Sequence, residues 1–96
     1  MSELAGLFFE EYPRLLEQVK ESIAKSDSES LERAAHCLKG SVANFAARDA
    51  YDAALALEKL GREGNLASAT RACERLEAEI NLLRIALSGL LMGEAA

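Results

Sequence analysis

Residues 34–47 read AAHCLKGSVANFAA and contain the only histidine of the 96-residue chain. Apolar side chains recur here every three or four positions, which is typical of an amphipathic helix. At about 100° per residue, one arc of roughly 120° collects Leu31, Ala34, Ala35, Leu38, Ser41, Val42 and Phe45. His36 projects almost opposite the centre of that arc. We therefore expect the arc to face the core and the histidine to face water.

The neighbours of His36 on the helix surface are unusual. Lys39, at i+3, shares the histidine's side of the helix, and Gly40, at i+4, leaves the other flank bare. A glycine inside a helix costs about 1 kcal/mol relative to alanine. An open approach to His36 would compensate that cost.

The motif His36-Cys37-Leu38-Lys39-Gly40-Ser41 resembles the His-x-Leu-Lys-Gly-Ser motif of histidine-containing phosphotransfer (Hpt) domains of bacterial phosphorelays. Asn44-Phe45-Ala46-Ala47 follows, with Ala46 where the family usually has glycine. The segments FFEEYPRLL (residues 8–16) and LALE (residues 55–58) also look like the family. The resemblance thus covers nearly the whole chain. We expect the motif helix to continue smoothly through Ala46, because alanine is the better helix former.

The resemblance implies a phosphocarrier. His36 would accept a phosphoryl group from the phospho-aspartate of a receiver domain and pass it to another receiver. The implied partners are receiver domains of response regulators and a sensor or hybrid histidine kinase. No cofactor of its own is expected, since the magnesium would be bound by the receiver. The scattered glycines form no nucleotide-binding motif, so we expect no kinase activity.

The chemistry of the residues agrees with this role. A neutral imidazole has a free ring nitrogen that can act as a nucleophile, and phosphoryl transfer needs positioning and charge compensation. Lys39 is expected to compensate phosphate charge and Gly40 to leave access. The expected partner surface comprises Arg33, Lys39, Gly40 and Ala43, with Leu7 or Phe9 contributing from the first helix.

Two other readings stay open. The first is a phosphorylation-inert helical module that binds receivers or kinases without transferring phosphate. The second is an enzyme or metal site that uses His36 with Cys37 or Glu32. The side chains of Cys37 and His36 point about 100° apart around a helix. They are therefore poorly placed to act as a nucleophilic pair. Glu32 and His36 would supply only two metal ligands, and a site needs at least a third, so no metal site is expected.

Composition narrows the class of protein. Half of the residues are hydrophobic and 28% are charged, and sixteen acidic against eleven basic residues give a net charge of −5. That charge disfavours nucleic acid, and no apolar run is long enough for a membrane span. Cys37 and Cys73 are expected to be free thiols in a reducing cytoplasm. We expect one cytoplasmic, monomeric domain over residues 1–96, either free-standing or part of a larger, membrane-anchored sensor.

The periodicity predicts an all-α fold, an antiparallel four-helix bundle. The first helix spans about residues 4–25 and should be short or kinked, because Pro13 favours a kink or a break near Glu11 and would then lie in the first turn of a second helix. The motif helix spans about 29–45, capped by Asp27 or Ser28. A third helix should run from an Asp49 N-cap to a Gly64 C-cap. The seam of the last helix comprises Leu66, Ala69, Cys73, Leu76, Ile80, Leu83, Leu87 and Leu90.

Overall fold

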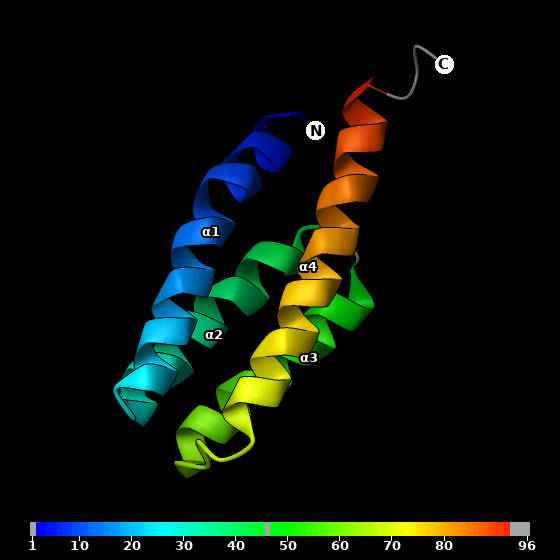
Figure 1. Ribbon diagram of the computed structural model, residues 1–96. Helices are drawn as coiled ribbons and strands as arrows, with labels where there is room; N and C mark the ends of the chain where they lie inside the picture. The colour runs from blue at the N-terminus through cyan, green and yellow to red at the C-terminus, as the bar shows by residue number, and fades with distance from the viewer. Residues whose placement is uncertain (1, 46, 93–96) are drawn as a thin grey trace.

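The computed structural model describes residues 2–45 and 47–92, which form four α-helices and contain no strand. Their bounds are α1 Ser2–Ala24, α2 Ser28–Ala43, α3 Arg48–Glu63 and α4 Ala69–Met92. The helices run alternately down and up, and each packs against its neighbours in the chain while α4 also packs against α1 (Figure 1). The predicted antiparallel four-helix bundle is confirmed.

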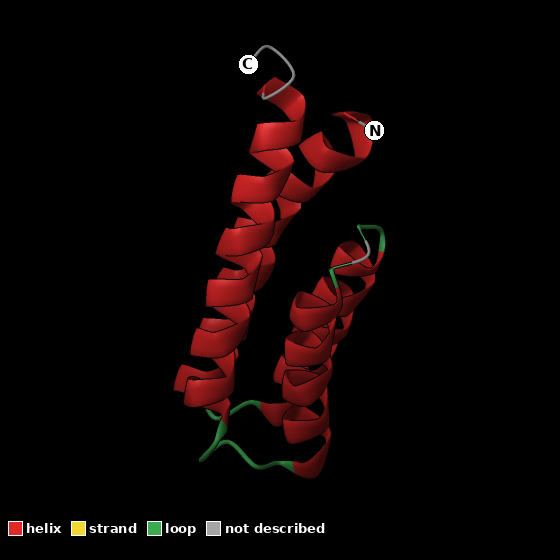
Figure 2. Ribbon diagram, turned by 90° about the vertical axis from the view of Figure 1, so that its right-hand side faces the viewer, coloured by secondary structure: helices red, strands yellow, loops and turns green. Residues whose placement is uncertain are grey.

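The bundle has two layers of unequal length. α1 and α4 form one layer, and the shorter α2 and α3 form the other, so the upper ends of α1 and α4 extend beyond their partners (Figure 2). The molecule is elongated, with principal extents of 46 × 19 × 18 Å. Among the described helices, none is long and apolar enough to cross a membrane.

The predicted core is largely confirmed. Leu31, Leu38, Val42, Leu57, Leu76 and Ile80 are fully buried. Phe45 and Leu83, also expected in the core, are only partly buried and pack against it. The seam of α4 buries Ala69, Cys73, Leu76, Ile80 and Leu87. Leu66 precedes α4 and is partly buried, and the side chains of Leu4 and Leu90 lie outside the described part of the structure.

The expected break near Glu11 is absent. α1 is a single 23-residue helix that contains Pro13. Pro13 lacks an N–H and crowds the carbonyl four residues earlier, but its own side chain is exposed. Phe8, Leu15 and Leu16, on either side of Pro13, are all buried. Packing of this apolar stripe on both sides holds the helix together, which local propensity could not reveal.

Two helix ends differ from expectation. α2 ends at Ala43, before Phe45, because the Asn44 and Phe45 N–H groups bond to carbonyls three residues back and tighten the last turn. Ala46, where we expected continuing helix, lies outside the described residues. α3 begins at Arg48 with Ala47 as N-cap, so the Asp49 cap is wrong; Asp49 lies in the first turn instead. The Gly64 C-cap is confirmed, with a left-handed φ of 72°.

Candidate functional site

α2 begins at a well-formed cap that fixes its position. The Asp27 carboxylate accepts hydrogen bonds from the Ser30 N–H at 3.2 Å and the Ser30 hydroxyl at 2.8 Å, as predicted for this cap. These bonds lower the pKa of Asp27 below its ordinary value. From this start, α2 directs Leu31, Ala35 and Leu38 into the core and leaves His36 on the outer side.

His36 is exposed, as expected, and held by one bond. Its side chain is 66% exposed, and Nδ1 lies 2.9 Å from Oε2 of Glu58 on α3. A carboxylate can only accept hydrogen bonds, so Nδ1 must carry the proton in this contact. Nε2 has no hydrogen-bond partner among the described residues. In the neutral ring, the lone pair is therefore on Nε2, which is the nitrogen that is free to react.

Glu58 is the buried centre of the site. The residue is only 4% exposed, and a buried carboxylate requires compensating charge. Lys39 Nζ lies 2.8 Å from Oε1, and Arg62 Nη2 lies 3.4 Å from Oε2. The contact with Lys39 is the main cause that lowers the pKa of Glu58, and the bond to His36 acts in the same direction against the effect of burial. Glu58 is therefore ionised at neutral pH.

The two basic partners of Glu58 are held differently. Lys39 is 18% exposed and lies 6.0 Å from the ring centroid of Tyr51. Its contact with Oε1 is an ion pair without good hydrogen-bond geometry. Arg62 is 58% exposed and also donates from Nε to Glu32 at 3.0 Å. Arg62 thus connects α3 to α2 beside the histidine.

Two glycines shape the surroundings of this cluster. At Gly61, an added Cβ would lie 2.7 Å from the backbone nitrogen of Glu32 and 3.0 Å from the carbonyl oxygen of Ser28. Gly61 therefore lets α2 and α3 approach closely enough for Glu58 to reach His36. At Gly40 an added Cβ would meet nothing within 4 Å. There is therefore open space at this position on α2, and its role in access to His36 stays a prediction.

Comparison with protein families matches residues 3–86 to the Hpt domain. The chain belongs to the Hpt domain family. No match was found among curated proteins or among solved structures. Hpt domains are helical phosphotransfer modules of two-component signalling, and they generally lack kinase activity of their own. As a family they interact with receiver domains and histidine kinases.

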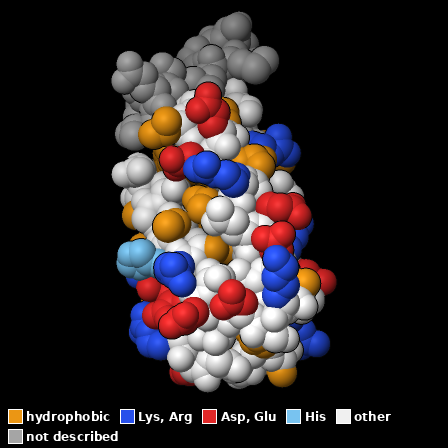
Figure 3. Space-filling model, turned by 90° about the vertical axis from the view of Figure 1, so that its left-hand side faces the viewer, with side chains coloured by type: hydrophobic (Ala, Val, Ile, Leu, Met, Phe, Trp, Pro, Cys, Tyr) orange, Lys and Arg blue, Asp and Glu red, His pale blue; other side chains and the backbone are white. Residues whose placement is uncertain are grey.

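The structure of this Hpt domain brings some of the expected site residues together. Arg33 is exposed and lines a shallow hollow with His36 and Glu58. Ala43 is exposed two turns beyond His36 on α2, and it lines a separate hollow with Tyr51. Figure 3 shows the histidine at the edge of its view, bordered by charged side chains, with hydrophobic side chains scattered over the rest of that face. Leu7 is 54% exposed and Phe9 is partly buried, both on α1.

Sequence reasoning missed Glu58 and Arg62 as site residues. Glu58 lies next to Leu57 and one turn from Ala54 and Gly61 on the buried side of α3. A carboxylate in a buried stripe is seldom found without a cationic partner. That anomaly was visible in the sequence and could have identified Glu58. Arg62, at i+4 from Glu58, would then have followed.

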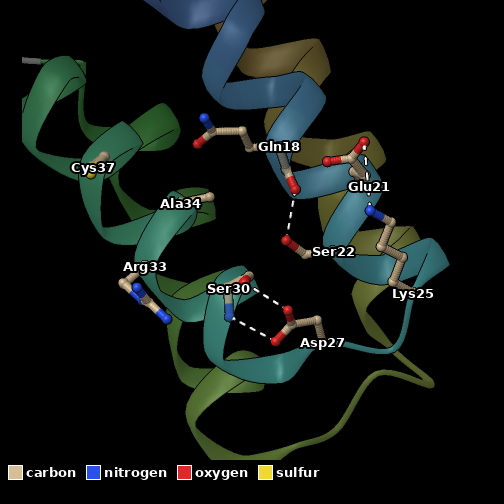
Figure 4. Close-up of a pocket in the computed structure, with 9 residues that line it drawn as sticks. All are labelled: Gln18, Glu21, Ser22, Lys25, Asp27, Ser30, Arg33, Ala34 and Cys37. Carbon is tan, nitrogen blue, oxygen red and sulfur yellow. Dashed lines mark hydrogen bonds and ion pairs between the residues drawn. The ribbon is translucent and has the colours of Figure 1, made fainter.

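The cysteines of this Hpt domain do not form a disulfide. Cys37 is exposed and Cys73 is buried, and burial raises the pKa of the Cys73 thiol. Cys37 lines a groove between α1 and α2 whose other lining residues are mostly polar (Figure 4). There the Ser22 hydroxyl donates to the Gln18 carbonyl and the Ser30 hydroxyl donates to Asp27. The groove is thus bordered by polar groups that bind one another. Among the described residues, no three His, Cys, Asp or Glu side chains are grouped as metal ligands.

Proposed function

We propose that His36 is the phosphoacceptor of a carrier that takes a phosphoryl group from a receiver phospho-aspartate and gives it to a second receiver. The observation that supports this most directly is the bond from His36 Nδ1 to the buried carboxylate of Glu58 at 2.9 Å. That bond fixes the tautomer that places the nucleophilic lone pair on exposed Nε2. A surface histidine without such a partner would lack this preorganisation.

In the proposed step, Nε2 attacks the phosphorus in line with the aspartyl oxygen. The Nε2–P bond forms as the bond between phosphorus and the carboxylate oxygen breaks, and the receiver aspartate leaves as a carboxylate. The ring gains positive charge while Nδ1 keeps its proton. Glu58 stabilises that charge through the bond to Nδ1, and transfer to the second receiver reverses these changes. Magnesium on the receiver would supply further charge compensation.

Lys39 must change partners to compensate the phosphoryl charge. Its ammonium group is now 2.8 Å from Glu58 Oε1, in an ion pair without a well-directed hydrogen bond. Release of Lys39 would leave the buried carboxylate with His36 and with Arg62, which is already 3.4 Å from Oε2. We therefore propose that Arg62 keeps Glu58 neutralised when Lys39 turns toward the phosphate.

The open surface around His36 is proposed as the receiver contact. Gly40 leaves space beside the ring for the incoming phosphorylated loop, and Arg33 and Ala43 are exposed on the same helix. Arg33 can bind carboxylates of a receiver, and Ala43 offers a small apolar contact. The domain needs no cofactor of its own in this proposal.

The test is phosphotransfer from a phosphorylated cognate receiver. Label should appear on this protein as an acid-labile, base-stable adduct, be absent in His36→Gln, and form more slowly in Lys39→Ala. The matched control is Cys37→Ser, which changes the exposed neighbour and should label normally. Protein given only ATP and magnesium should stay unlabelled.

The same assay separates this proposal from the alternative of an inert binding module. Undiminished label in His36→Gln would refute His36 as the acceptor. Binding of receivers without transfer from any receiver of the source organism would favour the inert module.

A further inference from the structure

α4 carries a second row of regularly spaced side chains, on the side opposite the core. Arg71, Arg75, Ala78, Leu82 and Ile85 follow alternating spacings of four and three residues. At about 100° per residue, they fall within an arc of about 80° centred opposite the buried seam. We call these five residues the outer seam. The spacing is the one by which helices pack against each other in coiled coils.

The outer seam is uncovered in this molecule. Leu82 is 62% exposed and Ile85 is 59% exposed, which makes them two of the three large exposed hydrophobic residues described. Both lie in the C-terminal half of α4, the long helix whose upper end extends beyond α2 and α3 (Figure 2). Isolated exposed leucines are common, but two at successive seam positions form a continuous apolar ridge.

The lower half of the outer seam borders a groove between α3 and α4. Ala53, Ala56 and Leu60 line it from α3, and Ala72 lines it beside Arg71 and Arg75 from α4. The groove measures about 210 Å³ and is mostly apolar. Its small side chains would let a third helix approach closely between α3 and α4.

Two arginines border the groove. Arg71 and Arg75 are both exposed and stand one turn apart, where like charges destabilise a helix. The ion pairs of the described residues involve other basic side chains. A chain with a net charge of −5 thus places two neighbouring arginines beside an apolar groove, and neither forms an ion pair among the described residues, although Glu74 and Glu79 are nearby in sequence.

We propose that the outer seam and its groove are the docking site of an acidic amphipathic helix from a partner protein. The apolar ridge of that helix would pack on Leu82 and Ile85, and its carboxylates would pair with Arg71 and Arg75. A second copy of this chain fits poorly. An antiparallel copy that paired all five seam positions would set the arginines against Leu82 and Ile85 of the other molecule, and a parallel copy would set arginine against arginine.

This docking site is separate from the phosphotransfer site. Ala53, Ala56 and Leu60 lie on α3 at about 160–220° from Glu58 around the helix axis. A partner in the groove would therefore leave His36 accessible to a receiver. The inference stands on the α3–α4 face alone and does not depend on phosphorylation of His36.

Binding of designed helical peptides tests the proposal. The two peptides are amphipathic helices of about four turns with the same row of leucines. Beside the first half of that row, one peptide carries glutamates and the other carries lysines. Chemical-shift mapping on the 15N-labelled full chain with the glutamate peptide should perturb the outer seam and the groove and leave His36 and Glu58 unchanged. The lysine peptide should bind at least tenfold more weakly.

Variants of the full chain make the test specific. The double variant Arg71→Glu, Arg75→Glu should reverse the preference between the two peptides, and Leu82→Ser with Ile85→Ser should weaken both at least tenfold. Arg14→Glu on α1 with Lys25→Glu in the turn that follows it changes the charge by the same amount at exposed positions, and this variant should bind like the parent. Unchanged circular-dichroism melting verifies that each variant is folded.

Three results would overturn the proposal. They are equal binding of the two peptides, perturbations located elsewhere on the molecule, and self-association in sedimentation that disappears in the Leu82→Ser, Ile85→Ser variant. The last result would identify a second copy as the occupant.

Discussion

The two sides of α2 differ most clearly at two glycines. Where α2 faces α3, Gly61 lies so close to the α2 backbone that a Cβ would come within 2.7 Å of the Glu32 nitrogen. On the outer side, a Cβ added at Gly40 would meet no atom within 4 Å. One glycine is required by contacts inside the domain. The other is explained by something outside it, which in our proposal is the docked receiver.

The largest effect should come from truncating the inner side of α2. Leu38 is fully buried, so Leu38→Ala should lower the free energy of unfolding by about 2–5 kcal/mol. His36→Gln, on the outer side, should leave the melting temperature nearly unchanged. Urea denaturation of both variants measures the contrast, and a large loss in His36→Gln would show that the histidine is structural.

Gly61→Ala should have the next largest effect. The added methyl meets backbone atoms of Glu32 and Ser28, which cannot move without separating α2 from α3. Overpacking of this kind costs about 1–3 kcal/mol. The same separation should weaken the bond between Glu58 and His36, which the ring 15N chemical shifts of His36 report. Unchanged stability would mean that the two helices slide apart easily.

The ion pair of Glu58 should appear as a pH dependence of stability. Its pKa is lower in the folded protein than in the unfolded chain, mainly because of Lys39. Between the two pKa values, the unfolded chain therefore binds more protons than the folded protein. The stabilisation by Glu58 is present above its unfolded-state pKa and is lost as the pH falls through its folded-state pKa. Unfolding measured between about pH 6 and pH 3 should show a smaller loss in Glu58→Gln. Asp27→Asn is the variant for comparison, because the pKa of Asp27 is also lowered in the folded protein and Asp27 therefore also contributes a loss of stability as the pH falls.

A smaller change in stability, of the opposite sign, is expected at Gly40. Gly40→Ala should raise stability by up to about 1 kcal/mol, since alanine favours the helix and meets no neighbour. Gly40→Leu should remain folded and slow transfer from a receiver several-fold, because the side chain would fill the approach to His36. Transfer at the parental rate in Gly40→Leu would remove the functional explanation of this glycine.

The bundle and the exposed histidine were predictable because both depend on periodicity within single helices. The spacing of Leu31, Leu38 and Val42 alone places them in the core and His36 outside it. The break that we considered at Pro13 is absent, because the effect of a proline depends on packing of the residues around it. The N-cap of α3 was misplaced by two residues, since Asp49 is as suitable for a first turn as for a cap.

The partners of His36 were harder to predict. Glu58 comes from α3, and its reach to His36 depends on how closely that helix packs on α2. Arg62 acts through Glu58, one turn away on the same helix. Nothing in the periodicity of either helix specifies the separation between their axes. Gly61 specifies it, but only the structure shows which backbone atoms Gly61 faces.

The site also lies within one local part of the chain. His36 and Glu58 are 22 positions apart, and α2 and α3 form a helical hairpin over residues 28–63. Closing a short loop costs less entropy than joining distant segments, and local contacts form faster. During folding, the contact between α1 and α4 must wait for nearly the whole chain. We expect His36 to meet Glu58 early, while the layer that buries Leu76 and Ile80 is still assembling.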